Sequence, residues 1–531
     1  MGLLRYTASA DNTITNGYQL DLKTRGSGAN AGVADVLEVY SMYGRINSSS
    51  QELSRAIIKF PLDQITNDRT AGNVPKSGSV NFYLRLFNAK HSKTTPIEYK
   101  LVVSAVSQSW EEGTGLDLEG YKDKTNGNLG SDWIQAKKGT NWTDYKGQAA
   151  PGGTYSTASG ETFTQHFSGG LEDLEIDVSD LVEKWIAKTA TTVNNYGFGI
   201  FLSSSYEASA SQQAVDLDSN VLYNPDGATE SYYTKRFFAR GTQYFFKRPV
   251  IEARWDSTTR DDRGNCFFSS SRAPAIDNLN KIYFYNLVRG RLVDLPGIGS
   301  TYGTLASQIK VSVFSGSVAN SEPSGSAVFL HNTSAKSLVV TGGYVSTGIY
   351  SCSLCFTKST DLETLYDVWF SGSSATSDAS AAARQYFTGT MNPKEFTTGV
   401  TPLNPTYYCN ISNLKNSYQH NETVRLNLYV REKNWNPNIY TRATSQVESL
   451  SIRSASYGVV RLLDNEMVIP YGTGSEFHTG LSYNVSGNYF DFDMSLLEKG
   501  YAYGFKFVFY DDTINSWIEQ DKIFKFWLEE R

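Results

Sequence analysis

The strongest constraint on this chain is an alternation of apolar and polar residues with a period of two. It occurs in residues 80–86, 196–202, 424–430 and 501–509, in both the N-terminal and the C-terminal parts of the sequence. Successive side chains of an extended strand point to opposite faces, so this alternation predicts strands with one buried face. Short strands separated by Gly, Ser and Asn turns predict an all-β fold of packed sandwiches rather than β-α-β units.

One segment departs from this period and predicts a short helix. Its apolar residues recur at intervals of three and four positions: Val178, Leu181, Val182, Trp185 and Ile186. That spacing places them on a single helical face. Asp177 or Ser179 is suited to cap the first turn, because a side-chain oxygen accepts from the free backbone N–H groups there. We expect this helix to cover one end of the first sandwich.

Turn-rich and proline-rich stretches divide the chain into segments of domain size. Polar residues 256–264 follow a strand that ends at Trp255, and prolines recur between Pro393 and Pro402. Proline removes a ladder donor, so a strand through the second stretch is disfavoured. We therefore predict three domains: residues 1–257, 258–397 and 398–531. The last two have the length and strand content of immunoglobulin-like β-sandwiches.

Charge and cysteine content narrow the partners. The 531 residues carry a formal net charge of -6, and binding to nucleic-acid phosphates needs a concentrated basic surface, so we expect no nucleic-acid partner. The sequence begins without a basic segment followed by an apolar core and contains no bilayer-length apolar run, so we expect neither a secretion signal nor membrane insertion. The cysteines, Cys266, Cys352, Cys355 and Cys409, are predicted to be buried, reduced thiols.

No pattern of catalytic or cofactor-binding residues stands out. The five histidines have no HxH or HExxH spacing, and neither a Gly-x-Ser-x-Gly elbow nor a phosphate-binding Gly-Lys-Ser/Thr loop occurs. We therefore predict no catalytic residues, no cofactor and no enzymatic activity.

Several short motifs follow one another in the first 257 residues. They are Ala-Asp-Asn-Thr-Ile at 10–14, Arg-Ala-Ile-Ile-Lys-Phe at 55–60, Ser-Trp-Glu-Glu at 109–112, Asp-Val-Ser-Asp-Leu-Val at 177–182 with Trp185, Tyr-Gly-Phe at 196–198, and Arg-Pro-Val-Ile-Glu-Ala at 248–253. In this order they resemble the DNRLRE family of jelly-roll domains, which occurs in surface and secreted bacterial proteins and is similar to carbohydrate-binding modules. The resemblance implies an N-terminal jelly-roll β-sandwich with one short capping helix, ahead of two immunoglobulin-like β-sandwiches.

The chain departs from that family by an insertion at about residues 113–165. This version, with the three-part layout, resembles virion structural proteins of marine tailed phages, especially T4-like phages of cyanobacteria. The resemblance implies a neck, tail or fibre-associated component that assembles with other virion proteins and with copies of itself. It also implies assembly in the host bacterial cytoplasm and residence in the virion. An insertion of this size can remodel the loops of any sugar site that the jelly-roll family would provide.

An acidic loop that begins just before the insertion and continues into it is a candidate calcium site. Its carboxylates include Glu112, Asp117, Glu119 and Asp123. Ca²⁺ prefers six to eight oxygen ligands, but the spacing does not match an EF-hand. A solvated or subunit-facing acidic loop is the favoured interpretation.

Aromatic residues also gather in the insertion: Tyr121, Trp133, Trp142 and Tyr145. Exposed aromatic side chains anchor protein interfaces or stack on sugar rings. For Trp133 and Trp142 we favour a protein interface over a core position and over a sugar platform; for Trp110, just before the insertion, we favour core packing.

Three functional hypotheses remain open. The first is a structural component of a tailed-phage virion that acts through protein–protein assembly. The second is a carbohydrate-binding adhesin that contacts a glycan on the host surface. The third, a polysaccharide depolymerase, needs two carboxylates facing each other across a groove, and the sequence identifies no such pair.

Overall fold

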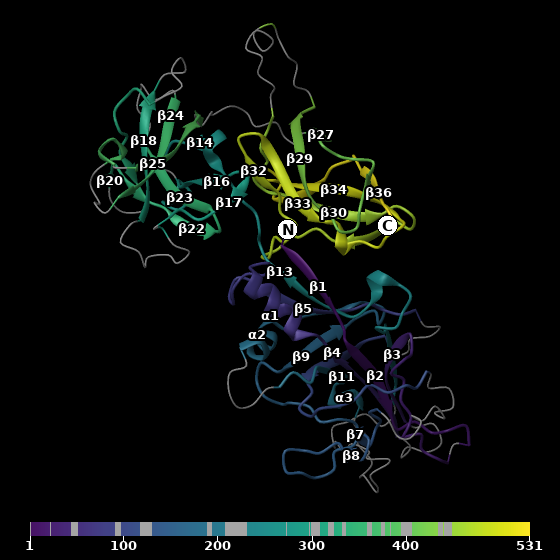
Figure 1. Ribbon diagram of the computed structural model, residues 1–531. Coiled ribbons are helices and arrows are strands. Elements are labelled where there is room, and N and C mark those ends of the chain that lie inside the picture. Colours follow the sequence, from purple (N-terminus) through teal and green to yellow (C-terminus); the bar gives the residue numbers. More distant parts are fainter. Residues whose placement is uncertain are drawn as a thin grey trace. The chain divides into compact units, whose positions relative to one another are not determined.

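The computed structural model describes residues 2–21, 23–43, 51–90, 97–116, 130–187, 194–207, 231–271, 273–296, 298, 308–316, 323–331, 336–357, 364–372, 378–382, 384–394, 406–433, 439 and 449–530. They form two compact units, which we call the first and the second unit. The first comprises Gly2–Asp256 with Gly474–His478, and the second comprises Ser257–Thr473 with Thr479–Arg531. Both are built from β-sheets, as the alternation predicted (Figure 1).

The first unit contains two antiparallel sheets that pack face to face. The smaller has the order β1 (Leu3–Thr7), β13 (Val250–Arg254), β5 (Asn81–Leu86) and β10 (Leu174–Asp177). The larger has the order β12 (Ser231–Phe238), β3 (Val36–Tyr43), β4 (Gln51–Lys59), β11 (Phe198–Leu202), β6 (Tyr99–Ala105) and β9 (Thr162–Phe167), with β2 (Ala10–Thr15) also paired to β4. Their facing side chains form one core that includes Phe82, Leu84, Ile58, Phe198 and Ile251.

Helix α2 (Ser179–Ala187) confirms the predicted amphipathic helix. Leu181, Val182 and Trp185 are buried in the core of the sandwich, and the Trp185 ring meets Phe198 edge-on at 5.0 Å. Asp177 Oδ1 accepts a hydrogen bond from the Ser179 N–H at 2.9 Å, so an oxygen sits at the helix start as expected.

The described residues contain two further α-helices that were not predicted. They are α1 (Leu62–Ala71) and α3 (Ser204–Glu207). Only Leu62 and Ile65 of α1 are buried, so its sequence carries almost no amphipathic signal. Tertiary contacts and capping compensate: Arg69 donates to both oxygens of Glu183 on α2 at 2.6 and 2.7 Å, and Gly72 ends the helix in the left-handed conformation. Figure 1 shows α1 and α2 side by side.

The second unit contains a sandwich in its middle part, residues 266–394. One sheet has the order β15 (Asn280–Tyr285), β23 (Ile349–Phe356), β19 (Leu330–His331) and β20 (Lys336–Ser337), with β22 (Gly343–Ser346) also on β23. The other has the order β21 (Val340–Thr341), β18 (Gln308–Gly316), β24 (Thr364–Gly372) and β25 (Arg384–Met391). Short pairs form between β14 (Cys266–Phe267) and β26 (Pro393–Lys394) and between β16 (Leu287–Val288) and β17 (Arg291–Leu292). Trp369 and Tyr350 lie at the centre of the core.

The remaining part of the second unit is another sandwich, with a strongly aromatic core. One sheet has the order β27 (Tyr407–Ile411), β29 (Thr423–Glu432), β33 (Gly487–Asp493) and β32 (Ser482–Asn484). The other has the order β28 (Ser417–Tyr418), β36 (Phe524–Leu528), β34 (Ala502–Asp511), β30 (Ala455–Arg461) and β31 (Glu466–Ile469), with β35 (Ser516–Glu519) on β34. Tyr457 stacks on Phe490 at 4.5 Å, and Phe505 stacks on Phe526 at 4.8 Å. The chain is therefore an all-β protein made of successive sandwiches, as predicted.

Candidate assembly surfaces

The insertion covers the outer face of the larger sheet of the first unit at strands β2 and β4. Trp133 and Trp142 are 1% and 0% exposed, and they join Trp110 in a second apolar cluster. The sheet contributes Ile14 from β2 and residues Leu53 and Ile57 from β4 to this cluster; hairpin β7 (Gln135–Lys137) and β8 (Thr140–Asn141) contributes Ala136. The prediction that Trp133 and Trp142 lie at an exposed interface is therefore wrong, because both side chains are buried within the chain. The core position predicted for Trp110 is confirmed.

The physical reason for this correction lies in strand β4. Its inward side chains Ala56 and Ile58 enter the main core, while Leu53 and Ile57 on the opposite face are equally buried. A sheet that is apolar on both faces needs a cover on each, because exposed aliphatic area raises the free energy of the folded state. The apolar residues on both faces of β4 were the sequence signal that the insertion folds back onto the sheet.

An ion pair lies beneath the insertion beside the tryptophans. Arg55 Nε and Nη2 donate to the two oxygens of Glu207, each at 2.8 Å, and Arg55 Nη1 donates to the Gly152 carbonyl at 2.9 Å. The guanidinium lies 5.4 Å from the centre of the Trp133 ring. A buried guanidinium is tolerated only when it is paired and hydrogen-bonded, so this arrangement fixes the insertion on the sheet.

Glu112 is the one candidate calcium ligand within the described residues, and its carboxylate binds Arg240 and a backbone N–H instead. Glu112 Oε2 accepts from Arg240 Nη2 at 2.7 Å, and Glu112 Oε1 accepts from the Asp11 N–H at 2.8 Å. Asp11 in turn accepts from the Arg240 N–H at 2.6 Å. Asp117, Glu119 and Asp123 lie outside the described residues. Within the ranges that the structure describes, no three His, Cys, Asp or Glu side chains gather as a metal-ligand set.

Burial changes the protonation of Asp11. Desolvation raises the pKa of its carboxyl to about 7, with a further contribution from Glu112, against the hydrogen bond from the Arg240 N–H. Glu112 and Asp11 thus act as anchors at the base of the insertion, and their carboxylates are directed to Arg240.

Tyr145 differs from the other aromatic candidates. Its side chain is 89% exposed, and the Lys146 ammonium lies 5.2 Å from the centre of its ring. Tyr121 is outside the described residues. The interface role of Tyr145 therefore stays a prediction, and among the described residues Tyr145 is the one candidate aromatic side chain that is exposed.

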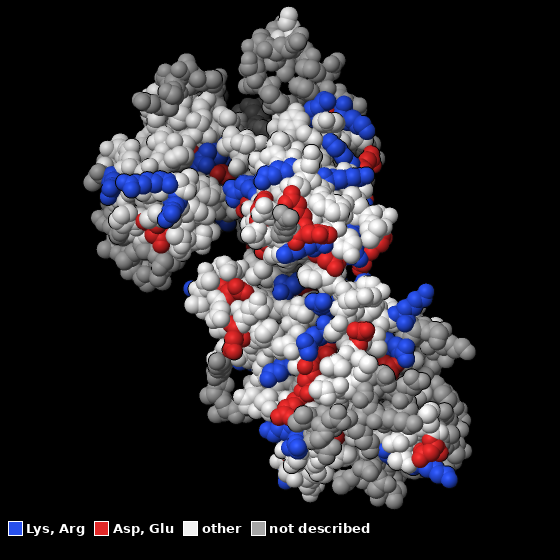
Figure 2. Space-filling model, turned by 45° about the vertical axis from the view of Figure 1, so that its right-hand side comes forward, with Lys and Arg blue, Asp and Glu red and all other residues white. Residues whose placement is uncertain are grey.

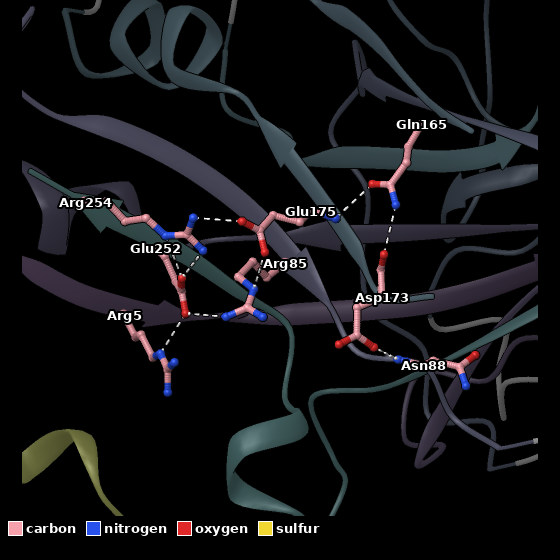
Figure 3. Close-up of polar contacts among 8 residues, drawn as sticks. All are labelled: Arg5, Arg85, Asn88, Gln165, Asp173, Glu175, Glu252 and Arg254. Carbon is pink, nitrogen blue, oxygen red and sulfur yellow. Dashed lines mark hydrogen bonds and ion pairs between the residues drawn. The ribbon is translucent and has the colours of Figure 1, made fainter. Parts of the chain in front are cut away.

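The outer face of the smaller sheet carries a buried polar network (Figure 3). Glu252 on β13 accepts from Arg5 at 2.8 Å, from Arg85 at 3.0 Å and from Arg254 at 2.7 Å. Burial by itself raises the pKa of Glu252, but the three guanidinium groups outweigh burial and hold its pKa well below the ordinary range. Glu175 on β10 bridges Arg85 and Arg254 at 3.2 and 2.7 Å. Carboxylates that are paired with several arginines link neighbouring strands. They stay ionised and therefore have no proton to donate.

Nearby polar contacts tie β10 to its surroundings. Gln165 donates to the Asp173 carbonyl at 2.9 Å and accepts from the Glu175 N–H at 2.8 Å, while the Asn88 N–H donates to Asp173 at 2.7 Å (Figure 3). The network and these contacts span all four strands of the smaller sheet, and they were not predicted from the sequence.

All four cysteines are buried and free, as predicted. Burial raises the pKa of the Cys409 thiol to about 12, and it raises the pKa of Cys352 and Cys355 as well. Because the thiolate is the reactive form, these side chains behave as core residues.

The second unit presents two exposed surfaces that sequence reasoning missed. One is strand β25, of which five of eight residues are exposed. The other is the hairpin of β16 and β17, which we call, with its flanking residues, the hairpin arm (residues 285–293). The sequence signal for the arm was Arg289-Gly290-Arg291 between two Leu-Val pairs, a pattern typical of a β-hairpin turn.

Charge on the visible surface is mixed. Figure 2 shows Lys and Arg side chains interspersed with Asp and Glu on the face in view. None of the helices within the described residues has the length and apolarity that a bilayer crossing requires. The expectations of no nucleic-acid partner and no membrane insertion stay predictions.

Comparisons with known proteins name no family for this chain. No protein-family model matches it, and no curated protein does. Solved structures that resemble it include the fibronectin(III)-like modules of CbhA from Clostridium thermocellum, at 10% identity over 52% of this chain and 92% of that chain, with a TM-score of 0.14. They also include DIP-gamma IG1+IG2, at 13% identity over 42% and 84% of the two chains, with a TM-score of 0.12.

A third similar structure is trypsin-activated α2-macroglobulin from Escherichia coli, at 8% identity over 92% of this chain and 30% of that chain, with a TM-score of 0.14. Likenesses of this size carry no argument about function. The class that the strand pairing itself defines is an all-β protein of linked sandwiches, with an insertion folded onto the first of them.

Proposed function

We propose that this chain is a structural component of a tailed-phage virion, associated with the neck, tail or fibres, and that it acts through protein–protein assembly. The observation that carries the assembly part is strand β25. The resemblance of the whole chain, with its insertion and three-part layout, to virion proteins of tailed phages supports the assignment to a phage particle.

Strand β25 is an edge strand with the properties of a pairing site. It pairs along its length with β24, and among the described residues no strand pairs with its other side. An edge of this kind presents a row of N–H and C=O groups to which another chain can add a strand. Its segment from Gln385 to Thr390 contains neither proline nor a charged side chain, the residues by which edge strands commonly avoid such pairing.

The interior of the molecule also suits a scaffold. Strand β4 of the larger sheet of the first unit is covered on both faces, and the Arg55–Glu207 pair holds the groups beneath the insertion. Rigid sandwiches that join through modest interfaces gain affinity from symmetry and multivalency in a particle.

The test is immunogold electron microscopy of purified particles from lysed cells that produce this chain, with an antibody against the second unit. We expect label at one fixed site on the neck, tail or fibres. A matched virus stock carrying Thr388→Lys, which places a charge on the exposed face of β25, should lose label from the particles while the free chain remains folded. Particles that carry the other tail proteins but no copies of this chain would refute the proposal.

The alternative, a glycan-binding adhesin, has a narrower basis than the sequence suggested. Trp133 and Trp142, its main candidates, are buried, and Tyr145 is the exposed ring that remains from that group within the described residues. A glycan array with the full chain distinguishes the two functions. Reproducible binding that Tyr145→Ala abolishes would favour the adhesin.

A further inference from the structure

The hairpin arm is a rigid extension of strand β15. Leu287 pairs with Leu292 and Val288 with Arg291, so the arm has one cross-strand leucine pair on one face and a Val–Arg pair on the other. Arg289 and Gly290 form its turn with φ of 51° and 77°. Positive φ at both central residues matches the tight turn that suits the twist of a two-stranded hairpin.

The base of the arm is fastened to the neighbouring turn of the sandwich. The Asn286 N–H donates to the Gly348 carbonyl at 2.8 Å, and the Asn286 side chain donates to the Val293 carbonyl at 2.6 Å. Asp294 accepts from the Gly348 N–H at 2.7 Å. These contacts hold the arm in one position before any partner binds, which lowers the entropy lost on association.

The arm nevertheless exposes apolar side chains on both faces. Leu287 is 60% exposed, Val288 49%, Val293 42% and Leu292 40%. A single two-stranded hairpin is marginally stable in water unless its apolar side chains pack against something. Contiguous exposed apolar residues on a rigid element mark an interaction site.

We propose that the hairpin arm binds the hairpin arm of a second copy of this chain about a two-fold axis, leucine pair against leucine pair. The distribution of charged residues on the arm favours a second copy as the partner. Arg289 and Arg291 lie at the tip, and the half-buried Asp294 lies at the base. When two arms pack antiparallel, each positive tip approaches the negative base of the other, and the contact is self-complementary, as a two-fold interface requires.

The same charges disfavour a membrane as the occupant. A hairpin that inserts into a bilayer carries apolar residues at its tip, whereas this tip carries two arginines, and a guanidinium in hydrocarbon is strongly unfavourable. A typical stable interface buries roughly 800 Å² per partner, and the arm offers only a few apolar side chains, so the pair is expected to be weak and concentration-dependent on its own.

The first experiment is sedimentation velocity of the full chain over a roughly hundredfold concentration range. We expect a reversible dimer that Leu287→Ser combined with Leu292→Ser weakens by roughly tenfold or more. The matched control is Ile276→Ser, an exposed aliphatic residue of the same sandwich but outside the arm, which should leave association unchanged. Circular dichroism of each variant confirms that it remains folded.

A second measurement tests the geometry through cross-linking. Because all four native cysteines are buried, Leu292→Cys introduces an accessible thiol on the leucine face of the arm. Mild oxidation should then produce a covalent dimer, and Leu463→Cys on the following sandwich, at a position that is 76% exposed against 40% for Leu292, should not.

Three outcomes would overturn the inference. They are a wild-type chain that stays monomeric at every concentration, a dimer that the leucine variants do not weaken, and sedimentation of the chain with phosphatidylcholine–phosphatidylglycerol vesicles that those variants abolish. The last would assign the arm to a membrane. The inference is independent of the virion proposal: a chain that is absent from particles but dimerises through the arm would refute the virion role and leave the dimer in place.

Discussion

The insertion and the hairpin arm are two apolar segments that leave a β-sandwich, and they end in opposite environments. The insertion folds back onto its sheet, where Trp133 and Trp142 meet Leu53 and Ile57. The hairpin arm extends beyond its sheet and leaves Leu287 and Leu292 in solvent. Aromatic content alone therefore does not identify an interface. What decides is whether the sheet beneath a segment offers an apolar face that still needs covering.

The largest effect is expected from the buried member of this comparison. Trp133→Ala should lower the free energy of unfolding by about 3–5 kcal/mol, because it removes a large side chain from a packed cluster and leaves a cavity. Urea unfolding of the full chain measures this. Tyr145→Ala, a fully comparable truncation at an exposed position of the insertion, should change stability by less than about 0.5 kcal/mol. Equal effects of the two variants would contradict the burial of the insertion.

The ion pair beneath the insertion should have the next largest effect. Glu207→Gln keeps the shape of the side chain but removes the charge that Arg55 faces, so we expect a loss of about 1.5–3 kcal/mol in the free energy of unfolding. The control Glu98→Gln changes an exposed partner of His166 and should be close to neutral. A stability gain in Glu207→Gln would show that desolvation of the pair outweighs its attraction.

Asp11 at the base of the insertion should make stability depend on pH. Its pKa is about 7 in the folded chain against 3.8 ordinarily, so between these values the folded state binds a proton that the unfolded state has released. Stability from this group is therefore highest below about pH 4 and falls as pH rises toward and beyond 7. Between pH 5 and pH 7 the loss should be about 2 kcal/mol.

Asp11→Asn isolates that contribution, because an amide does not titrate in this range. The difference in unfolding free energy between Asp11→Asn and the wild-type chain, measured by urea unfolding, should shift in favour of the variant as pH rises from 5 to 7. An unchanged difference over this interval would mean that Asp11 is ionised in the folded chain at both pH values.

The smallest effect on stability is expected in the hairpin arm. Leu287→Ser with Leu292→Ser should lower the free energy of unfolding by less than about 1 kcal/mol, since a cross-strand pair in solvent contributes little. Thermal unfolding at low protein concentration, where the chain is monomeric, measures this without any contribution from association. A loss as large as that of Trp133→Ala would show that the arm packs within its own chain, and the contrast between the two segments would disappear.

Much of the fold could be predicted from local patterns. The period-two alternation at residues 424–430 became β29, and the three-and-four spacing around Trp185 became α2. These signals are readable because a strand or helix with one buried face imposes its own period on the sequence. Helix α1 lacks such a period and was not predicted, because it buries only Leu62 and Ile65 and is held by the contact of Arg69 with Glu183.

The candidate surfaces were less predictable. The acidic and aromatic residues of the insertion looked available in sequence, yet Glu112 pairs with Arg240 and Trp142 is fully buried. The network around Glu252 joins residues from four strands, and its members are up to about 250 positions apart in the sequence, as with the 247 positions between Arg5 and Glu252. No local pattern records such a pairing.

The sequence by itself determined that this chain is built of half-buried strands, where its capping helix lies, and that its thiols belong in cores, because each of these depends on the periodicity or character of nearby residues. Which apolar segments are covered depends on the packing of the sheets in three dimensions. Trp133 is buried because β4 has a second apolar face, and Leu287 is exposed because the arm extends past the turn at Gly348. Burial is a property of what lies opposite a side chain in space, and that partner is set by how the sheets pack.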